Sequence, residues 1–154
     1  MKKRICSVVL TIFIFNALLG TTIAADTAFK KTKIVVVEDG KTKEIQSLIT
    51  WKASEVVIEV KEKKFKDLSV TVPYSQMSDL TYERSKHSRM AAALLISPLM
   101  LFSKRKHHWF SFNYVNANEK KQSILLRVDK KEERLYRRIV PTLTGLELEE
   151  IIED

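Results

Sequence analysis

Beyond residue 25 the chain is a series of short β-prone segments separated by turn residues, which restricts it to a small, mainly antiparallel sheet structure. Glu55–Val60 is rich in β-branched residues, and Leu68–Val72 alternates apolar with mostly polar residues. Pro73 ends the second of these segments, because proline donates no hydrogen bond to a central strand. Trp109–Val115 is aromatic and β-prone.

A β-hairpin is predicted near the start of this region. Lys33–Val37 is β-branched and is followed by Glu38–Lys41, which contains Asp-Gly, a strong hairpin signal. The return strand covers Thr42–Ser47 or continues to Trp51. Asp26–Lys33 is polar, and we expect it to be a frayed leader.

Two further strands are predicted, at Asp79–Arg84 and Gln122–Val128, with a turn at Asn116–Lys120 before the second. The sequence therefore predicts about seven short strands with turn chemistry between them, which is typical of a small barrel or sandwich.

One helix is predicted after the last strand. Asp129 followed by Glu132 matches a capping box, and Gly145 supplies a C-terminal stop. Pro141 should kink the helix or end it early. The expected apolar face consists of Leu135, Tyr136, Ile139, Val140 and Leu143. The segment beyond it, Leu146–Asp154, has no clear assignment.

Several stretches occur in an order that resembles a family. They are VPYSQMSDLTYERSKHSR, an apolar run, FSKRKHHWFSFNY, ILLRVDKKEERLYRRI and LTGLELE. They are similar to small exported bacterial proteins of pleckstrin-homology-like (PH-like) type, mostly uncharacterised. The resemblance covers Gln46–Glu149. This sequence departs from the family pattern at Pro141, where an ordinary helix former is expected. It implies a mainly β, α+β fold: a PH-like barrel of about seven antiparallel strands, a short apolar insertion and one C-terminal helix. It implies no biochemical activity.

The N-terminus has the pattern of a secretory signal peptide. Met1–Arg4 is positively charged, Ile5–Leu19 is apolar, and small residues follow up to Ala25. We expect cleavage after Ala24 or Ala25 and an exported protein, periplasmic or secreted. The expected organisation is a signal peptide (1–25), a leader with the first strand (26–45), a PH-like domain (46–149) with an insertion at 90–103, and an acidic tail (150–154).

Residue types exclude most catalytic chemistry. Cys6, the single cysteine, lies in the expected signal peptide, so disulfides and thiolate chemistry are excluded from the exported part. Beyond it the sequence has only Gly40 and Gly145, too few for a phosphate-cradling loop. A hydrolase would need a base-activated serine, and no such arrangement is recognisable. We expect no enzyme and no cofactor.

The histidines are His87, His107 and His108, and all have cationic neighbours that lower imidazole basicity. His107 and His108 should point to opposite faces of a strand. We therefore expect no metal site. The carboxylates from Glu147 to Asp154 are expected to form a solvated charge run. The aromatic residues expected in the core are Trp51, Trp109, Phe110, Phe112 and Tyr114.

The apolar run Met90–Phe102 is the feature on which function depends. Its 13 residues are fewer than the about 20 that span a bilayer, and Ser97-Pro98 interrupts it. Basic residues flank both ends, whereas a membrane span usually carries them mainly on one side. Two interpretations remain open: a segment packed on the barrel, or a wedge that enters an anionic leaflet. The expected membrane or partner contacts are Arg84, Lys86, Arg89, Leu94, Leu95, Leu99, Leu101, Phe102, Lys104, Arg105 and Lys106.

The function predicted from these observations is a non-catalytic binding module of the cell envelope, peripheral at a membrane surface. Lys2, Lys3 and Arg4 lie in the expected signal peptide, so 24 of the 27 Lys and Arg remain against 19 Asp and Glu, and the exported part has a net charge of +5, which favours anionic lipid. The alternative is a soluble periplasmic module that binds a partner protein, with the insertion packed as core. Nucleic acid is not expected, because no binding motif is recognisable. The sequence specifies no oligomeric state.

Overall fold

The computed structural model describes residues 26–38, 41–86, 88 and 106–153. The expected signal peptide and the apolar run Met90–Phe102 lie outside these described residues. In the part of the chain that is described, no helix has the length and apolar character needed to cross a membrane.

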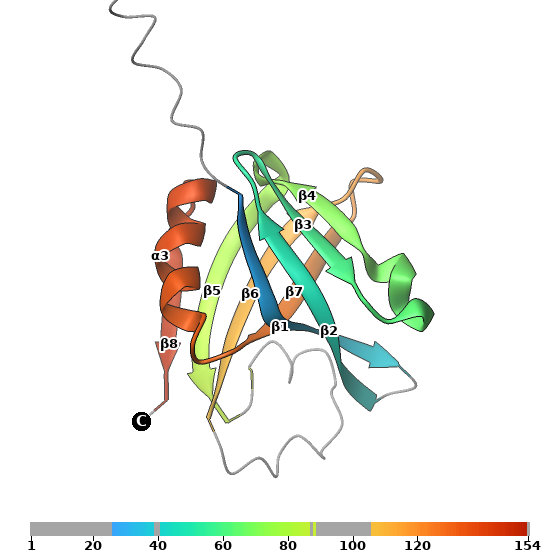
Figure 1. Cartoon of the computed structure of the whole chain (residues 1–154). Coiled ribbons are helices and arrows are strands. Elements are labelled where there is room, and N and C mark those ends of the chain that lie inside the picture. Colours follow the sequence, from blue (N-terminus) through green and yellow to red (C-terminus); the bar gives the residue numbers. More distant parts are fainter. Residues whose placement is uncertain (1–25, 39–40, 87, 89–105, 154) are drawn as a thin grey trace, which may run out of the picture.

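Eight strands form one strongly curved sheet (Figure 1). They are β1 (Thr27–Glu38), β2 (Lys41–Trp51), β3 (Glu55–Val60), β4 (Val70–Pro73), β5 (Met77–Ser85), β6 (His107–Val115), β7 (Lys121–Val128) and β8 (Leu148–Ile152). The order in the sheet is β4-β3-β2-β1-β7-β6-β5-β8. Neighbouring strands are antiparallel except β5 and β8, which are parallel.

The predicted class, mainly β with α (α+β), is confirmed, but two details differ. The sheet has eight strands instead of about seven. It is also open among the described residues, because β4 and β8 are its edges and no pairing joins them. The eighth strand comes from the segment Leu146–Asp154, whose alternation is too short to identify a strand from sequence alone.

The prediction that Asp26–Lys33 is a frayed leader is wrong, because β1 already begins at Thr27. Phe29 and Thr32 are buried, while Lys30 and Lys31 between them are exposed. The pairing with β2 shifts register between Phe29 and Thr32. This irregularity breaks the alternation of period two, and so the sequence pattern conceals the strand.

The other predicted strands are confirmed with small shifts at their ends. The hairpin joins β1 to β2, which takes the longer of the two expected courses and reaches Trp51. β3 has the predicted bounds. The segment between β3 and β4 contains a 3-10 helix, η1 (Lys63–Leu68), and a second one, η2 (Tyr74–Gln76), precedes β5.

The helix α3 (Glu133–Thr144) is present, but its ends differ from expectation. The capping box does not form: the Asp129 carboxylate accepts a hydrogen bond from the Lys131 N–H, and the Glu132 carboxylate lies 3.5 Å from the Thr32 hydroxyl. Pro141 does not end the helix. It lies in the last turn, where little helix remains to be disrupted, and its carbonyl accepts a hydrogen bond from Gly145 N–H. Gly145 stops the helix in the left-handed conformation, as predicted.

The buried face of α3 is centred on Tyr136 and Val140. Leu135 is exposed and Ile139 half-buried, so these two of the five expected apolar positions lie at the margin. The Tyr136 ring contacts Phe29, 3.9 Å away between ring centroids, and lies near Trp51 and Phe110. The helix therefore closes the core that the curved sheet surrounds. Of the expected aromatic core residues, Trp51, Phe110 and Phe112 are buried in this core and Tyr114 packs against it, whereas Trp109 is buried outside it.

Candidate functional site

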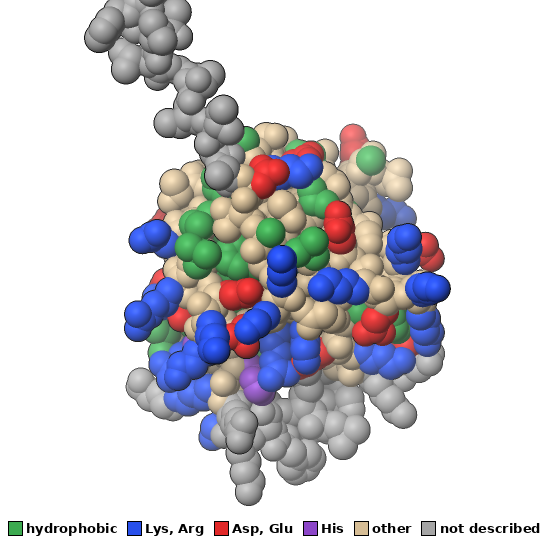
Figure 2. Space-filling view, in the orientation of Figure 1, with side chains coloured by type: hydrophobic (Ala, Val, Ile, Leu, Met, Phe, Trp, Pro, Cys, Tyr) green, Lys and Arg blue, Asp and Glu red, His purple; other side chains and the backbone are tan. Residues whose placement is uncertain are grey.

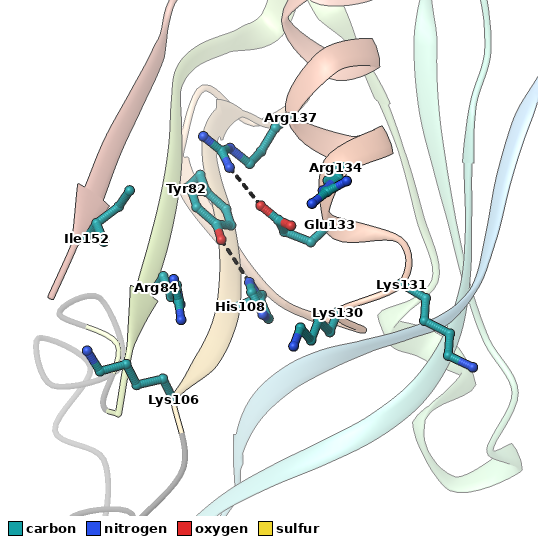
Figure 3. Close-up of a pocket in the computed structure, with 10 residues that line it drawn as sticks. All are labelled: Tyr82, Arg84, Lys106, His108, Lys130, Lys131, Glu133, Arg134, Arg137 and Ile152. Carbon is teal, nitrogen blue, oxygen red and sulfur yellow. Dashed lines mark hydrogen bonds and ion pairs between the residues drawn. The ribbon is translucent and has the colours of Figure 1, made fainter. Parts of the chain in front are cut away.

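A groove of about 970 Å³ lies between β5, β6, β8 and the start of α3 (Figure 3). We call it the basic groove, because six of its ten lining residues are Lys or Arg. The cations are Arg84, Lys106, Lys130, Lys131, Arg134 and Arg137. The other lining residues are Tyr82, His108, Glu133 and Ile152.

Strand geometry places the floor of the groove. Tyr82 and Arg84 are two residues apart on β5 and therefore share one face. His108 on β6 is paired in register with Arg84. The wall comes from the turn that precedes α3, which holds Lys130 and Lys131, and from the first turn of the helix, which holds Arg134.

Tyr82 and His108 form a polar pair in the floor. The Tyr82 hydroxyl lies 2.7 Å from His108 Nδ1. Burial lowers the pKa of His108, and the nearby cations Arg84 and Lys130 lower it further against an opposing contribution from Glu133. Burial also raises the pKa of Tyr82. Near neutral pH the imidazole is therefore neutral and the phenol protonated.

The carboxylate in the lining, Glu133, is already neutralised. Its Oε1 accepts a hydrogen bond of 2.8 Å from Arg137 Nη1. Burial alone would raise the pKa of Glu133, but hydrogen bonds from Arg137 and Tyr82 hold the pKa below its usual value. Arg137 also binds Glu150 on β8 with two hydrogen bonds and stacks over the Tyr82 ring. Arg137 is thus fully engaged within the protein.

The remaining cations lack such partners. Arg84, Lys130, Lys131 and Arg134 form no ion pair with any described residue. Lys106 Nζ donates a hydrogen bond of 2.6 Å to the backbone carbonyl of Glu153. The groove therefore presents a concentration of positive charge with little counter-charge, and this arrangement attracts anions.

The positive surface continues around the sheet. A second hollow, of about 280 Å³, shares Lys106, His108 and Lys130 with the basic groove. It extends the cationic lining to Lys31 and Lys33 on β1 and to Arg127 on β7. Figure 2 shows Lys and Arg side chains gathered around this part of the surface, beside a histidine.

The structure brings together some of the residues predicted from sequence. Arg84 and Lys106 both line the basic groove. Lys86 is exposed and does not line it; its backbone N–H donates to the Glu153 carboxylate at 3.3 Å. The other predicted contacts lie outside the described residues: Arg89, Leu94, Leu95, Leu99, Leu101, Phe102, Lys104 and Arg105.

The sequence did not predict the part of the site that α3 and the turn before it supply. Its residues are Lys130, Lys131 and Arg134, which belong to the segment DKKEERLYRRI, where basic residues recur at a helical spacing. That spacing was the available signal, but it does not indicate what the basic face lies against. His107 and His108 were predicted to point to opposite faces of a strand, and their contacts agree with this: His108 contacts Tyr82, whereas His107 packs against Trp109.

The expected carboxylate run also differs from a solvated tail. Glu150 pairs with Arg137, and the backbone of Glu153 bonds to Arg84 and Lys106. Within the described ranges, no group of three His, Cys, Asp or Glu side chains could hold a metal ion. The chemistry that the residues offer is recognition of negative charge by ammonium and guanidinium groups.

Comparison with known proteins leaves the chain without a family. No protein-family model and no curated protein matches it. Among solved structures it is similar to the hSac2 domain from human phosphoinositide phosphatase Sac2, with 12% sequence identity and a TM-score of 0.49. The match covers 100% of this chain and 91% of that one. A similarity this distant assigns neither a family nor an activity.

Proposed function

We propose that the protein is an exported, non-catalytic binding module of the cell envelope that attaches to an anionic membrane surface. The attachment uses the end of the sheet where β5 and β6 meet, with the apolar run Met90–Phe102 and its basic flanks. We assign the fold to the PH-like type. The seven consecutive antiparallel strands β4-β3-β2-β1-β7-β6-β5 and the helix α3 that closes their core support this assignment.

One observation carries the proposal. Ser85, the last residue of β5, is paired with His107, the first residue of β6. The two residues that bound the intervening segment therefore lie side by side at one end of the sheet. Arg84 and Lys106, which belong to the two basic flanks, both line the basic groove. An interfacial anchor requires an apolar segment next to a cationic surface, and here the strand ends that bound the apolar segment lie beside the basic groove.

Electrostatic attraction strengthens the proposal. Each Lys or Arg close to an anionic leaflet contributes about 1 kcal/mol, and the contribution decreases over about one Debye length. The basic groove and the hollow beside it hold several such residues on one side of the molecule. Adsorption should therefore weaken as salt increases.

Vesicle co-sedimentation tests the proposal. The protein should bind vesicles of phosphatidylcholine with phosphatidylglycerol at low salt and ignore pure phosphatidylcholine. Leu95→Asp and Leu99→Asp should each weaken binding, since a carboxylate resists entry into lipid. Val115→Asp is the matched control, because Val115 is exposed at the other end of β6 from His107. The proposal fails if the wild type ignores anionic vesicles, or if all three variants bind equally well.

A second function, binding of a partner protein, is favoured by one observation. β8 is an edge of the sheet, and its last residue, Ile152, is 54% exposed. An extended peptide could pair with this edge. Recovery of one stoichiometric envelope protein by the wild type, lost in a variant with Glu149→Pro, would favour this function. Vesicle binding should be unaffected by that substitution.

A further inference from the structure

The basic groove has a more specific composition than a surface that merely adsorbs to negative charge. Arg84 on β5 and Arg134 on α3 supply planar guanidinium groups, one from the floor of the groove and one from its wall (Figure 3). Lys106 and Lys130 add ammonium groups. Guanidinium groups bind phosphate through two parallel hydrogen bonds, whereas ammonium groups act as point charges.

The charge balance favours a ligand with more than one negative charge. Arg84, Lys130 and Arg134 have no ion-pair partner among the described residues. Glu133 does not compensate for them, because it is bound to Arg137. Glu150 binds the same Arg137 from β8, which leaves an excess of positive charge in the groove.

A phosphate monoester fits this excess best. Near neutral pH it carries about −1.5 to −2 charges and three acceptor oxygens. A phosphodiester or a carboxylate carries a single negative charge and offers only two charged acceptor oxygens. The volume of the groove, about 970 Å³, is larger than a phosphate group requires, so part of the attached molecule fits as well.

We infer that the basic groove binds a phosphate monoester group, held between Arg84 on β5 and Arg134 on α3. This inference deepens the proposed function and rests on it for the source of the ligand, a lipid headgroup at the anionic surface. A soluble phosphate monoester shares the same chemistry and would enter the same groove.

His108 gives the site an internal reporter. Its Nδ1 is engaged by the Tyr82 hydroxyl, so Nε2 is the ring nitrogen left for a ligand in the groove. A bound dianion would stabilise the imidazolium form. The His108 ring signals in an NMR spectrum should therefore shift when the groove is occupied.

The first experiment titrates the purified, isotope-labelled protein with glycerol 3-phosphate at constant ionic strength. Saturable shifts of His108 and of residues around Arg134 are expected, and dimethyl phosphate should produce much smaller ones. Arg84→Gln and Arg134→Gln should each weaken binding about tenfold, the value of one charge-assisted hydrogen-bonded contact. Arg138→Gln is the matched control: it removes the same charge from the same helix outside the groove lining and should change affinity less than twofold. The same spectra show whether each variant is folded.

The second experiment identifies the source of the phosphate. Vesicles containing phosphatidic acid, a monoester, are compared with vesicles containing phosphatidylglycerol, a diester, at equal surface charge. Stronger binding to phosphatidic acid that is lost in Arg134→Gln and kept in Arg138→Gln supports a lipid ligand. Groove shifts with glycerol 3-phosphate but no vesicle binding support a soluble ligand and overturn the proposed membrane function. Equal binding to both vesicles, with no saturable shift in the groove, overturns the inference and leaves the proposed function standing.

Discussion

The Tyr82 hydroxyl and His108 Nδ1 lie 2.7 Å apart and connect β5 to β6 in the floor of the basic groove. The two rings are also stacked, with centroids 6.1 Å apart. Around them lie three cations, Arg84, Lys130 and Arg137, and one carboxylate, Glu133. This polar pair is therefore held neutral in a strongly charged environment.

The first prediction concerns the pH dependence of stability. Burial lowers the pKa of His108 in the folded state. As pH falls below about 6.5, the His108 imidazole is therefore protonated at a higher pH in the unfolded chain than in the folded protein. The free energy of unfolding should therefore decrease between pH 7.5 and 5.5. Urea unfolding at the two pH values should show a smaller decrease for His108→Gln. His107→Gln, on the adjacent residue, should retain the wild-type decrease, and an equal decrease in both variants would contradict the assignment to His108.

The second prediction concerns a buried hydrogen bond between β1 and α3. The Tyr136 hydroxyl lies 2.9 Å from Thr32 Oγ1, and both side chains are fully buried. Tyr136→Phe should lower the free energy of unfolding by about 1–3 kcal/mol, because the Thr32 hydroxyl loses its closest partner in a dry site. Chemical denaturation measures the change.

A double-mutant cycle provides the control for this bond. Thr32→Val with Tyr136→Phe removes both hydroxyls, so the double variant should be less destabilised than the sum of the single variants. Additive effects would show that the two hydroxyls do not depend on each other. The cycle also tests whether β1 extends as far as Thr32, within the region expected to be a leader.

Local patterns predicted the strands well where alternation was unbroken. β3 and the hairpin between β1 and β2 follow directly from β-branched runs and an Asp-Gly turn. The start of β1 could not be predicted in the same way, because the irregularity between Phe29 and Thr32 places two lysines in succession on the surface. β8 was missed because its pairing with β5 is a long-range contact that no local period encodes.

The candidate site was predictable only in part, for a related reason. Arg84 and Lys106 were identified because they flank an apolar run in the sequence. Lys130 and Arg134 are distant from that run along the chain and reach the groove only because α3 packs over the sheet beside β5 and β6. A helical spacing of basic residues shows that they share a face, but tertiary packing decides what that face adjoins.

The third prediction concerns the attachment of β8. Arg137 on α3 holds Glu150 on β8 by two hydrogen bonds of 2.9 and 2.6 Å. Glu150→Gln should lower the free energy of unfolding by only about 0.5–1 kcal/mol, since the pair is partly exposed. Amide hydrogen exchange in β8 should accelerate while exchange in β6 stays unchanged. Glu149→Gln, which lacks an ion pair among the described residues, is the control and should leave β8 protection as it is.

The fourth prediction concerns Glu44 on β2, which joins three strands. Its carboxylate binds Arg127 on β7, with Nη1 2.6 Å from Oε2, and Lys33 on β1 at 3.1 Å. The pairing of β1 with β7 has only two residue pairs in register, Lys33 with Arg127 and Ile34 with Leu126, so this cluster reinforces a short junction. Glu44→Gln should lower the free energy of unfolding by about 1–2 kcal/mol, because two neighbouring cations lose their shared partner.

The pH dependence of the same variant makes the prediction specific. Burial alone would raise the pKa of Glu44, but Arg127 and Lys33 hold the pKa below its usual value of 4.5. The stabilisation is therefore present above pH 4.5 and is lost as pH falls through the lowered pKa, because the folded carboxylate must then accept a proton. Urea unfolding should show the difference between wild type and Glu44→Gln at pH 7 and a smaller difference near pH 3. Glu55→Gln, whose partner Lys52 is a surface residue three positions away, should cost less than about 0.5 kcal/mol at pH 7. A Glu44→Gln effect as small as this control, or one that persists unchanged in acid, would show that the cluster does not stabilise the junction of β1 with β7.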